Sequence, residues 1–171
     1  MKRIILMAND SPGMEVAKHL NLCGDKIVRL YLHDKNAKYV NEIIEESKCD
    51  KIFYANDLKK ADHHNDLKKE GADFIITVYW AYLLKPEIFQ SALDTVNFHP
   101  AYLPINRGWF PHVHSIIDGS KSGVTLHRID KGADTGPIWV QKEIKISKFD
   151  TAKEIYIRLQ DEIVKLRSEE H

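Results

Sequence analysis

Cysteine is scarce in this sequence, and long apolar runs are absent. Cys23 and Cys49 are its only cysteines, too few for a disulfide scaffold or a structural zinc site, so we expect two reduced thiols. The apolar run in the opening MKRIILMAND is five residues long, too short for a signal sequence or a membrane span. These absences predict a cytoplasmic protein with no membrane partner.

An excess of either charge is also lacking. The chain has 25 Lys and Arg residues against 25 Asp and Glu residues, so no basic field is present to bind nucleic acid through its phosphates. Small-molecule substrates are therefore expected rather than a large RNA.

With 171 residues, 43% of them hydrophobic, the chain suits one well-buried core and is too short for two ordinary domains. Residues 1–171 are thus predicted to form a single domain.

What the sequence does contain is a regular alternation of apolar runs and amphipathic stretches. Strands are predicted at residues 3–8, 26–33, 51–55, 73–80, 95–99, 123–130 and 137–146. Helices are predicted at residues 14–20 and 37–47, in the second half of 58–71, and at 85–93, 111–119 and 151–170. This order predicts an α/β fold of Rossmann-like type: a mostly parallel twisted sheet with helices on both faces and a C-terminal addition of antiparallel strands.

Two polar side chains, Asn97 and His99, stand at the end of the strand predicted at 95–99. Ligands of open α/β sheets bind beyond the carboxyl ends of the strands, and residues two apart on a strand share a face. An Asn amide and a His N–H can together donate to an oxygen that becomes negative when a nucleophile adds to its carbon. An isolated pattern of this kind is, however, more often a capped strand end with a packed histidine.

A carboxylate farther along the chain favours a catalytic role for Asn97 and His99 over a capped strand end. Asp134 lies in the Gly-rich loop KGADTG between the last two predicted strands, where it can approach a site built by other strands. A carboxylate beside an imidazole raises the imidazole pKa and can take or relay a proton. We therefore expect Asp134 to meet Asn97 and His99 in one accessible pocket.

The segment from Asn97 to Ile138 closely resembles the catalytic core of the formyltransferases that use 10-formyltetrahydrofolate. This family includes glycinamide ribonucleotide, methionyl-tRNA and sugar N-formyltransferases. Four linked motifs in the family's order, NFHPAYLP, NRGWFP, GVTLH and DTGPI, carry the resemblance, which extends more weakly from residue 1 to about 168. It implies that Asn97, His99 and Asp134 form a catalytic trio.

The resemblance also implies direct transfer of a formyl group. A substrate amine would attack the formyl carbon, Asn97 and His99 would stabilise the oxygen of the tetrahedral species, and Asp134 would help move the amine proton to the leaving nitrogen. The cosubstrate would be 10-formyltetrahydrofolate, with no metal. Two loops would hold the folate ring: Trp80, Ala81, Tyr82, Leu83 and Leu84 in one, and Ile129, Asp130, Gly132 and Ala133 in the other.

The acceptor amine is expected to belong to a nucleotide-linked amino sugar. The turn after the first strand, MANDSPG, has one glycine behind a proline that lacks an N–H, which disfavours the phosphate cradle of glycinamide ribonucleotide formyltransferase. The balanced charge and the lack of a further C-terminal domain disfavour a tRNA acceptor. Similarity to the sugar branch implies that Tyr102, Asn106 and Arg107 border the acceptor. Another small amine, or a non-enzymatic folate-binding module, remains the alternative.

Members of the sugar branch usually continue into further strands that make a dimer, and this chain is expected to lack them. The resemblance is still compatible with a homodimer.

Two groups of residues are expected to have structural rather than chemical roles. His63, His64 and Asp66 are expected on a solvated helix face rather than at a metal, and His127 is expected to brace the loop that carries Asp134.

Overall fold

A computed structural model describes residues 1–166 of the chain. Its internal contacts divide the chain into two units, Met1–Val96 and the part that begins at Asn97. Strand β5 (Asp94–His99) runs across the division. The seven strands are hydrogen-bonded in the order β3-β2-β1-β4-β5-β6-β7, which confirms the predicted sheet with a terminal pair of antiparallel strands. The prediction of a single domain stays a prediction.

The first unit alternates strands and helices. Its elements are β1 (Arg3–Ala8), α1 (Asp10–Leu22), β2 (Lys26–Leu32), α2 (Val40–Ser47), β3 (Ile52–Tyr54), the 3-10 turn η1 (Ala55–Lys59), α3 (Ala61–Lys69), β4 (Phe74–Val78) and α4 (Pro86–Phe89). Strand β1 pairs in parallel with β2 and β4, and β2 pairs in parallel with β3. Parallel strands need crossover connections, and here helices supply them.

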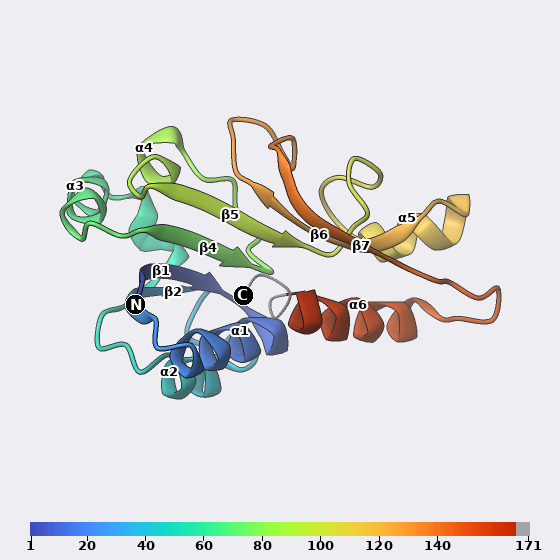
Figure 1. Ribbon diagram of the computed structural model, residues 1–171, viewed down its shortest axis with the longest axis horizontal. Coiled ribbons are helices and arrows are strands. Elements are labelled where there is room, and N and C mark those ends of the chain that lie inside the picture. Colours follow the sequence, from blue (N-terminus) through green and yellow to red (C-terminus); the bar gives the residue numbers. More distant parts are fainter. Residues whose placement is uncertain (167–171) are drawn as a thin grey trace. The chain divides into compact units, whose positions relative to one another are not determined.

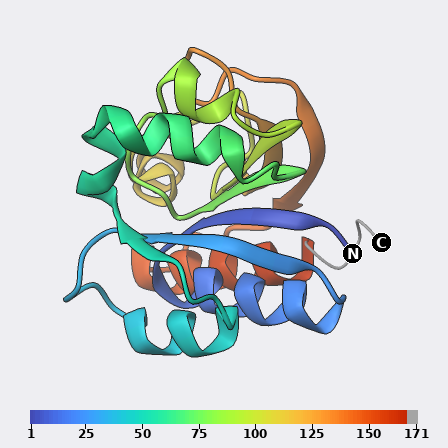
Figure 2. The same ribbon diagram turned by 90° about the vertical axis from the view of Figure 1, so that its left-hand side faces the viewer.

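Strands β1 and β2 are nearly continuous apolar runs because both of their faces are covered. Helices α1 and α2 lie on one side of them and α3 on the other (Figures 1 and 2). Side chains from Ile5 to Ala8 have no exposed surface, and Leu30 and Tyr31 have none either. A strand covered on only one face would have shown alternation of apolar and polar residues instead.

Helix α1 begins earlier than predicted, at Asp10 rather than after Gly13. Pro12 is tolerated because the first turn of a helix leaves its N–H groups without intrahelical partners. Gly13 is required for a different reason: a Cβ atom built there would lie 2.9 Å from the Cβ of Ala8. With glycine at position 13, α1 approaches β1 more closely than it could with any residue that has a Cβ atom.

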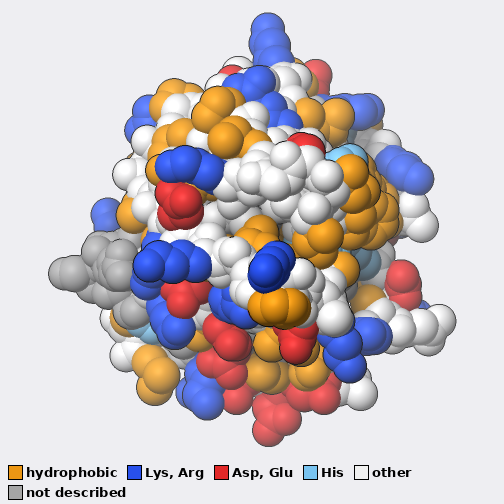
Figure 3. Space-filling model, turned by 90° about the vertical axis from the view of Figure 1, so that its right-hand side faces the viewer, with side chains coloured by type: hydrophobic (Ala, Val, Ile, Leu, Met, Phe, Trp, Pro, Cys, Tyr) orange, Lys and Arg blue, Asp and Glu red, His pale blue; other side chains and the backbone are white. Residues whose placement is uncertain are grey.

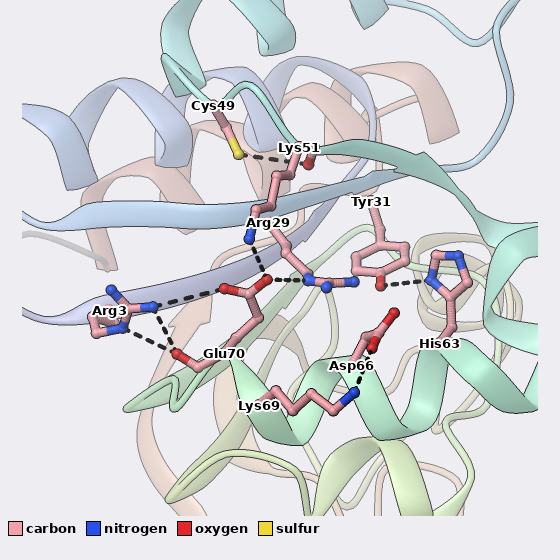
Figure 4. A network of polar contacts seen from close by, with 9 residues as sticks. All are labelled: Arg3, Arg29, Tyr31, Cys49, Lys51, His63, Asp66, Lys69 and Glu70. Atoms are coloured by element: carbon pink, nitrogen blue, oxygen red, sulfur yellow. Dashed lines mark hydrogen bonds and ion pairs between the residues drawn. The ribbon is translucent and has the colours of Figure 1, made fainter.

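A polar cluster joins the start of β1, the middle of β2 and the C-terminal end of α3 (Figure 4). The carboxylate of Glu70, at the end of α3, accepts hydrogen bonds from Arg29 Nε at 2.7 Å and Lys51 Nζ at 2.6 Å. Arg3 donates to the backbone carbonyl of Glu70 at 2.7 Å. The side chains of Glu70 and Arg29 are each 9% exposed. Because water compensates little of either charge, each of the two charges is stabilised by the other.

The second unit contains the end of β5, α5 (Pro111–Asp118), β6 (Ser122–Arg128), β7 (Ile138–Ile144) and α6 (Ala152–Leu166). Strands β6 and β7 are antiparallel, with Thr125 opposite Gln141. Helix α6 packs on both through the predicted stripe of Ile155, Leu159, Ile163 and Leu166, which is buried. The predicted continuation of this helix to residue 170 lies outside the described residues.

Differences from the sequence prediction are confined to the ends of elements. The strand predicted at 73–80 ends at Val78, because Tyr79 has a positive φ of 53° that no strand accommodates. The helix predicted at 85–93 is a single turn, and residues 37–39 precede α2 rather than belonging to it. None of these differences changes the fold class.

Candidate active site

The end of β5 brings Asn97 and His99 into one polar cluster with β6. The amide nitrogen of Asn97 lies 3.2 Å from Nε2 of His127, and the rings of His99 and His127 are T-shaped with centroids 6.2 Å apart. His99 is 7% exposed. Within residues 1–166, Nε2 of His99 has no hydrogen-bond partner, which is unusual for a buried polar atom.

The carboxylate of Asp134 reaches the same cluster from the loop between β6 and β7. Its two oxygens lie 3.5 Å from Nε2 of His99 and 3.5 Å from Nε2 of His127. The backbone N–H of Gly108 donates to the Oδ2 atom at 3.0 Å. Gly108 has a φ of +85°, so a glycine is needed for this loop to aim its N–H at the carboxylate. The predicted meeting of His99 with Asp134 is thus found.

Burial and charge set the protonation states of this pair. Burial lowers the pKa of His99 below its ordinary value of 6.5, against the opposing effects of the Asp134 carboxylate and of a hydrogen bond to the backbone of Asn106. Burial by itself raises the pKa of Asp134, but the contacts with His127, His99 and the N–H of Gly108 outweigh it and hold that pKa below its usual range. At neutral pH the site therefore holds an anionic carboxylate beside a neutral imidazole.

A set of hydrogen bonds fixes the chain between β5 and α5. The Thr125 hydroxyl donates to the carbonyl of Ala101 at 2.7 Å and accepts from the N–H of Leu103 at 3.2 Å. The Gln141 amide donates to the carbonyl of Leu103 at 2.7 Å. The two facing residues of β6 and β7 therefore position the segment that follows His99.

The three predicted acceptor residues lie along this segment. The amide of Asn106 donates to the hydroxyls of Ser115 and Ser120, at 2.9 and 2.7 Å, so both of its N–H groups hold the loop. Tyr102 is half-buried and stacks under the ammonium of Lys121, 5.1 Å from the ring centroid. Arg107 is exposed. Contact of the three with a substrate stays a prediction.

The first predicted folate loop follows β4 and carries an aromatic cluster. The rings of Trp80 and Tyr82 lie 5.0 and 5.2 Å from the ring of His33. Nε2 of His33 accepts the N–H of Ala81 at 3.2 Å, and burial lowers the pKa of His33, with Asp34 opposing it. Leu83 is exposed and Leu84 is buried. The sequence reasoning missed His33, although its place at the end of a predicted strand was a usable signal.

The second predicted folate loop follows β6. The carboxylate of Asp130 accepts the N–H of Gly132 at 2.9 Å and the hydroxyl of Thr135 at 2.5 Å. Asp130 therefore builds the turn that precedes Asp134. Ile129 is half-buried and Ala133 is exposed. Contact of this loop with a folate stays a prediction.

Comparison with known families decides the relationship of the chain. A family model described as formyl transferase matches residues 4–169. This chain belongs to the formyl transferase family. A dTDP-4-amino-4,6-dideoxyglucose formyltransferase of Mycobacterium tuberculosis is 54% identical over 76 residues, which are 44% of this chain and 32% of that protein. The match thus spans about a third of the curated relative's length.

Solved structures of formyl transferases share the fold. A 4-N formyltransferase from Francisella tularensis superposes with a TM-score of 0.80 and 27% identity, over 98% of this chain and 66% of that one. A phosphoribosylglycinamide formyltransferase from Streptococcus pneumoniae gives a TM-score of 0.82 over 99% of this chain and 96% of that one. Its identity of 22% shows the common fold alone.

The surface of this formyl transferase carries charges of both signs. Lys and Arg side chains are interspersed with Asp and Glu side chains on the face seen in Figure 3. No helix within residues 1–166 combines the length and apolar character that crossing a membrane requires. In the same residues, no three or more His, Cys, Asp and Glu side chains gather as a metal site would need. His63 and His64, which were expected on a solvated helix face, are half-buried, and His63 lies 3.2 Å from the hydroxyl of Tyr31.

Proposed function

We propose that this protein transfers a formyl group from 10-formyltetrahydrofolate to the amine of a nucleotide-linked amino sugar. The observation that carries the proposal is the anionic Asp134 held 3.5 Å from the buried, neutral His99, in a chain of the formyl transferase family. The name of the M. tuberculosis relative supports an amino sugar as the acceptor. Cytoplasmic location, small-molecule partners and a homodimer belong to the same proposal.

In the proposed reaction His99 acts first as the base and then as the acid, and Asp134 supports it electrostatically. The backbone contact of His99 with Asn106 uses Nδ1, because Nε2 has no hydrogen-bond partner within the described residues. In the neutral ring Nε2 therefore carries a lone pair, which accepts the proton that the attacking amine loses. The carboxylate of Asp134 stabilises the resulting imidazolium, and the imidazolium then delivers its proton to the leaving nitrogen.

Asn97 has the complementary task of stabilising negative charge. When bound, 10-formyltetrahydrofolate would supply a formyl carbon whose oxygen becomes negative as the amine adds. The amide N–H of Asn97 and the protonated Nε2 of His99 donate to that oxygen in the proposal. Donors held in a buried site need little reorganisation as charge develops, and one such donor commonly contributes about 10² to 10³ in kcat.

The loop after β4 has features that fit a folate ring. The indole N–H of Trp80 is buried and has no hydrogen-bond partner within residues 1–166, so a ligand acceptor would satisfy it. The rings of Trp80 and Tyr82 offer aromatic surface, and Leu83 beside them is exposed. In the proposal these residues bind and orient the ring.

The start of α1 argues against glycinamide ribonucleotide as the acceptor. A phosphate cradle needs backbone N–H groups at a helix N-terminus. Here the N–H of Ser11 is taken by the carboxylate of Asp10 at 2.8 Å, Pro12 has no N–H, and the N–H of Gly13 donates to the carbonyl of Asn9 at 3.3 Å. The negative charge of Asp10 would also repel a phosphate.

The proposal is tested by mixing the purified protein with 10-formyltetrahydrofolate and a panel of acceptors. The panel contains dTDP- and UDP-linked amino sugars, glycinamide ribonucleotide and the free amino sugars. We expect release of tetrahydrofolate, together with a formylated product seen by mass spectrometry, only with a nucleotide-linked amino sugar. Release with glycinamide ribonucleotide alone would replace the acceptor assignment, and release with no acceptor would overturn the proposed function.

A further inference from the structure

His127 occupies a central place in the candidate site that the proposed reaction does not use. It lies in β6, is 2% exposed, and contacts both Asn97 and Asp134 through one nitrogen. Nε2 is 3.2 Å from the amide nitrogen of Asn97 and 3.5 Å from Oδ1 of Asp134. The sequence predicted only that His127 braces the Asp134 loop, and the contact with Asn97 assigns it a further task.

The other nitrogen of the ring determines where its hydrogen sits. Nδ1 of His127 lies 2.7 Å from the backbone carbonyl of Arg128. A carbonyl oxygen only accepts, so Nδ1 must carry a hydrogen. The neutral ring has one hydrogen, and Nε2 is then a lone-pair acceptor.

This assignment determines which end of the Asn97 amide faces the ring. A lone pair on Nε2 accepts a hydrogen bond from the NH₂ group of Asn97, whose nitrogen is at hydrogen-bonding distance. If the amide were turned by half a rotation, its carbonyl oxygen would face that lone pair, and two acceptors would repel. A neutral His127 therefore selects one of the two amide orientations.

The carboxylate of Asp134 is the more distant neighbour of Nε2. Its Oδ1 atom is 3.5 Å away, which is long for a hydrogen bond, against 3.2 Å for the amide nitrogen of Asn97. The titratable groups that face His127 are Asp134, the His99 ring and, through charge, Asp130.

We propose that His127 is a positioning residue that keeps the NH₂ end of the Asn97 amide turned toward β6, so that Asn97 enters the reaction as a hydrogen-bond donor. The backbone carbonyl of Arg128 fixes the required tautomer. This inference deepens the proposed function and rests on it, because a donor is needed only where an oxygen becomes negative.

The first test reads the tautomer and the hydrogen bond directly, without any activity. In uniformly ¹⁵N-labelled protein at pH 7.5, the nitrogen shifts of His127 should be those of a neutral ring with its hydrogen on Nδ1. A scalar coupling across the hydrogen bond should link Nδ2 of Asn97 to Nε2 of His127. A hydrogen on Nε2 instead, or a doubly protonated ring, would overturn the inference even in a protein whose acceptor is still unknown.

The second test compares two substitutions by their kinetics. His127→Leu removes the acceptor, and we expect kcat to fall by about 10² or more while the KM values change less than about threefold. His127→Gln places a carbonyl oxygen near the position of Nε2. Its kcat should therefore be at least tenfold higher than that of His127→Leu. The half-buried His63 supplies the control. It lies in the first unit, Met1–Val96, and contacts Tyr31 of the same unit. His63→Leu should leave kcat unchanged.

These outcomes separate positioning from simple space filling. Equal losses of kcat in His127→Leu and His127→Gln, with unfolding temperatures equal to the unsubstituted protein, would show that the ring only fills volume. If the unsubstituted protein transfers no formyl group to any acceptor, the proposed function fails, and the NMR measurement alone decides the role of His127. If both variants fail to fold, that measurement again decides.

Discussion

Asp134 is the residue on which the electrostatics of the site depend. Its carboxylate contacts two imidazoles and accepts the N–H of Gly108. Asp134→Asn keeps an oxygen for Gly108 but removes the negative charge, so we expect kcat to fall by about 10² or more with little change in unfolding temperature. Steady-state kinetics and thermal unfolding check this.

A surface aspartate supplies the control for that substitution. Asp118 lies at the end of α5, is exposed, and accepts the N–H of Ser120. Asp118→Asn should leave kcat within about twofold, since this exposed carboxylate only caps a surface turn. A normal kcat in Asp134→Asn would remove the carboxylate from the proposed mechanism.

The buried His99 also predicts how activity depends on pH. Burial lowers its pKa below 6.5, so the ring is neutral at pH 7 and becomes protonated only as the pH falls below that value. The proposed base is the neutral ring, and kcat should therefore be full at neutral pH and fall along an acid limb that lies below pH 6.5. His99→Gln should have low kcat without this limb. A limb centred above pH 7 would contradict the assignment.

At the scale of elements, the Glu70 cluster joins α3 to β1 and β2. Glu70→Gln keeps the shape but leaves the nearly buried Arg29 without a compensating charge. We expect the free energy of unfolding to fall by about 2 to 3 kcal/mol, measured by urea unfolding at pH 7. Asp66→Asn, which breaks an exposed pair with Lys69 on the same helix, should cost less than about 0.5 kcal/mol.

The same cluster should respond to acid in a defined direction. Burial raises the pKa of Glu70, but the hydrogen bonds from Lys51 and Arg29 outweigh it and hold the pKa below its ordinary value of 4.5. The unfolded chain then binds this proton more readily than the folded one. The stabilisation is therefore complete above pH 4.5 and is lost as the pH falls through the lower, folded pKa.

Much of the element pattern was predictable because period and burial are local properties of sequence. The runs that became β1 and β2, and the stripe of α6, were correctly predicted. The contact of His33 with Ala81, and that of Glu70 with Arg29, join residues more than 40 positions apart. Such pairs depend on the completed sheet, and no local pattern encodes them.

The candidate site was predictable in part for a different reason. Asn97 and His99 were placed by strand geometry and Asp134 by its position in a Gly-rich loop, whereas the tautomer of His127 depends on one backbone carbonyl at Arg128. That carbonyl lies close to the shift in register between β6 and β7 at Leu126 and His127. Sequence alone contains no signal for such a detail.

At the scale of the whole molecule, the balance of charges predicts that the protein does not bind tRNA. Lysine and arginine equal aspartate and glutamate at 25 each, and both signs mix on the face in Figure 3. Added tRNA should therefore neither bind nor inhibit, since phosphate recognition needs a basic surface. Fluorescence anisotropy with labelled tRNA at about 50 mM salt checks this, and saturable binding in the micromolar range would contradict it.

The four residues Asn97, His99, His127 and Asp134 all belong to the unit that begins at Asn97. Their mutual distances are therefore set within that unit, by the end of β5, β6, the loop to β7 and the N–H of Gly108 that holds Asp134. Substitutions in Met1–Val96 can alter what is bound without retuning the proton chemistry. A laboratory that wishes to change the accepted folate analogue can therefore begin with the loop after β4 in that first unit and leave Asn97, His99, His127 and Asp134 untouched.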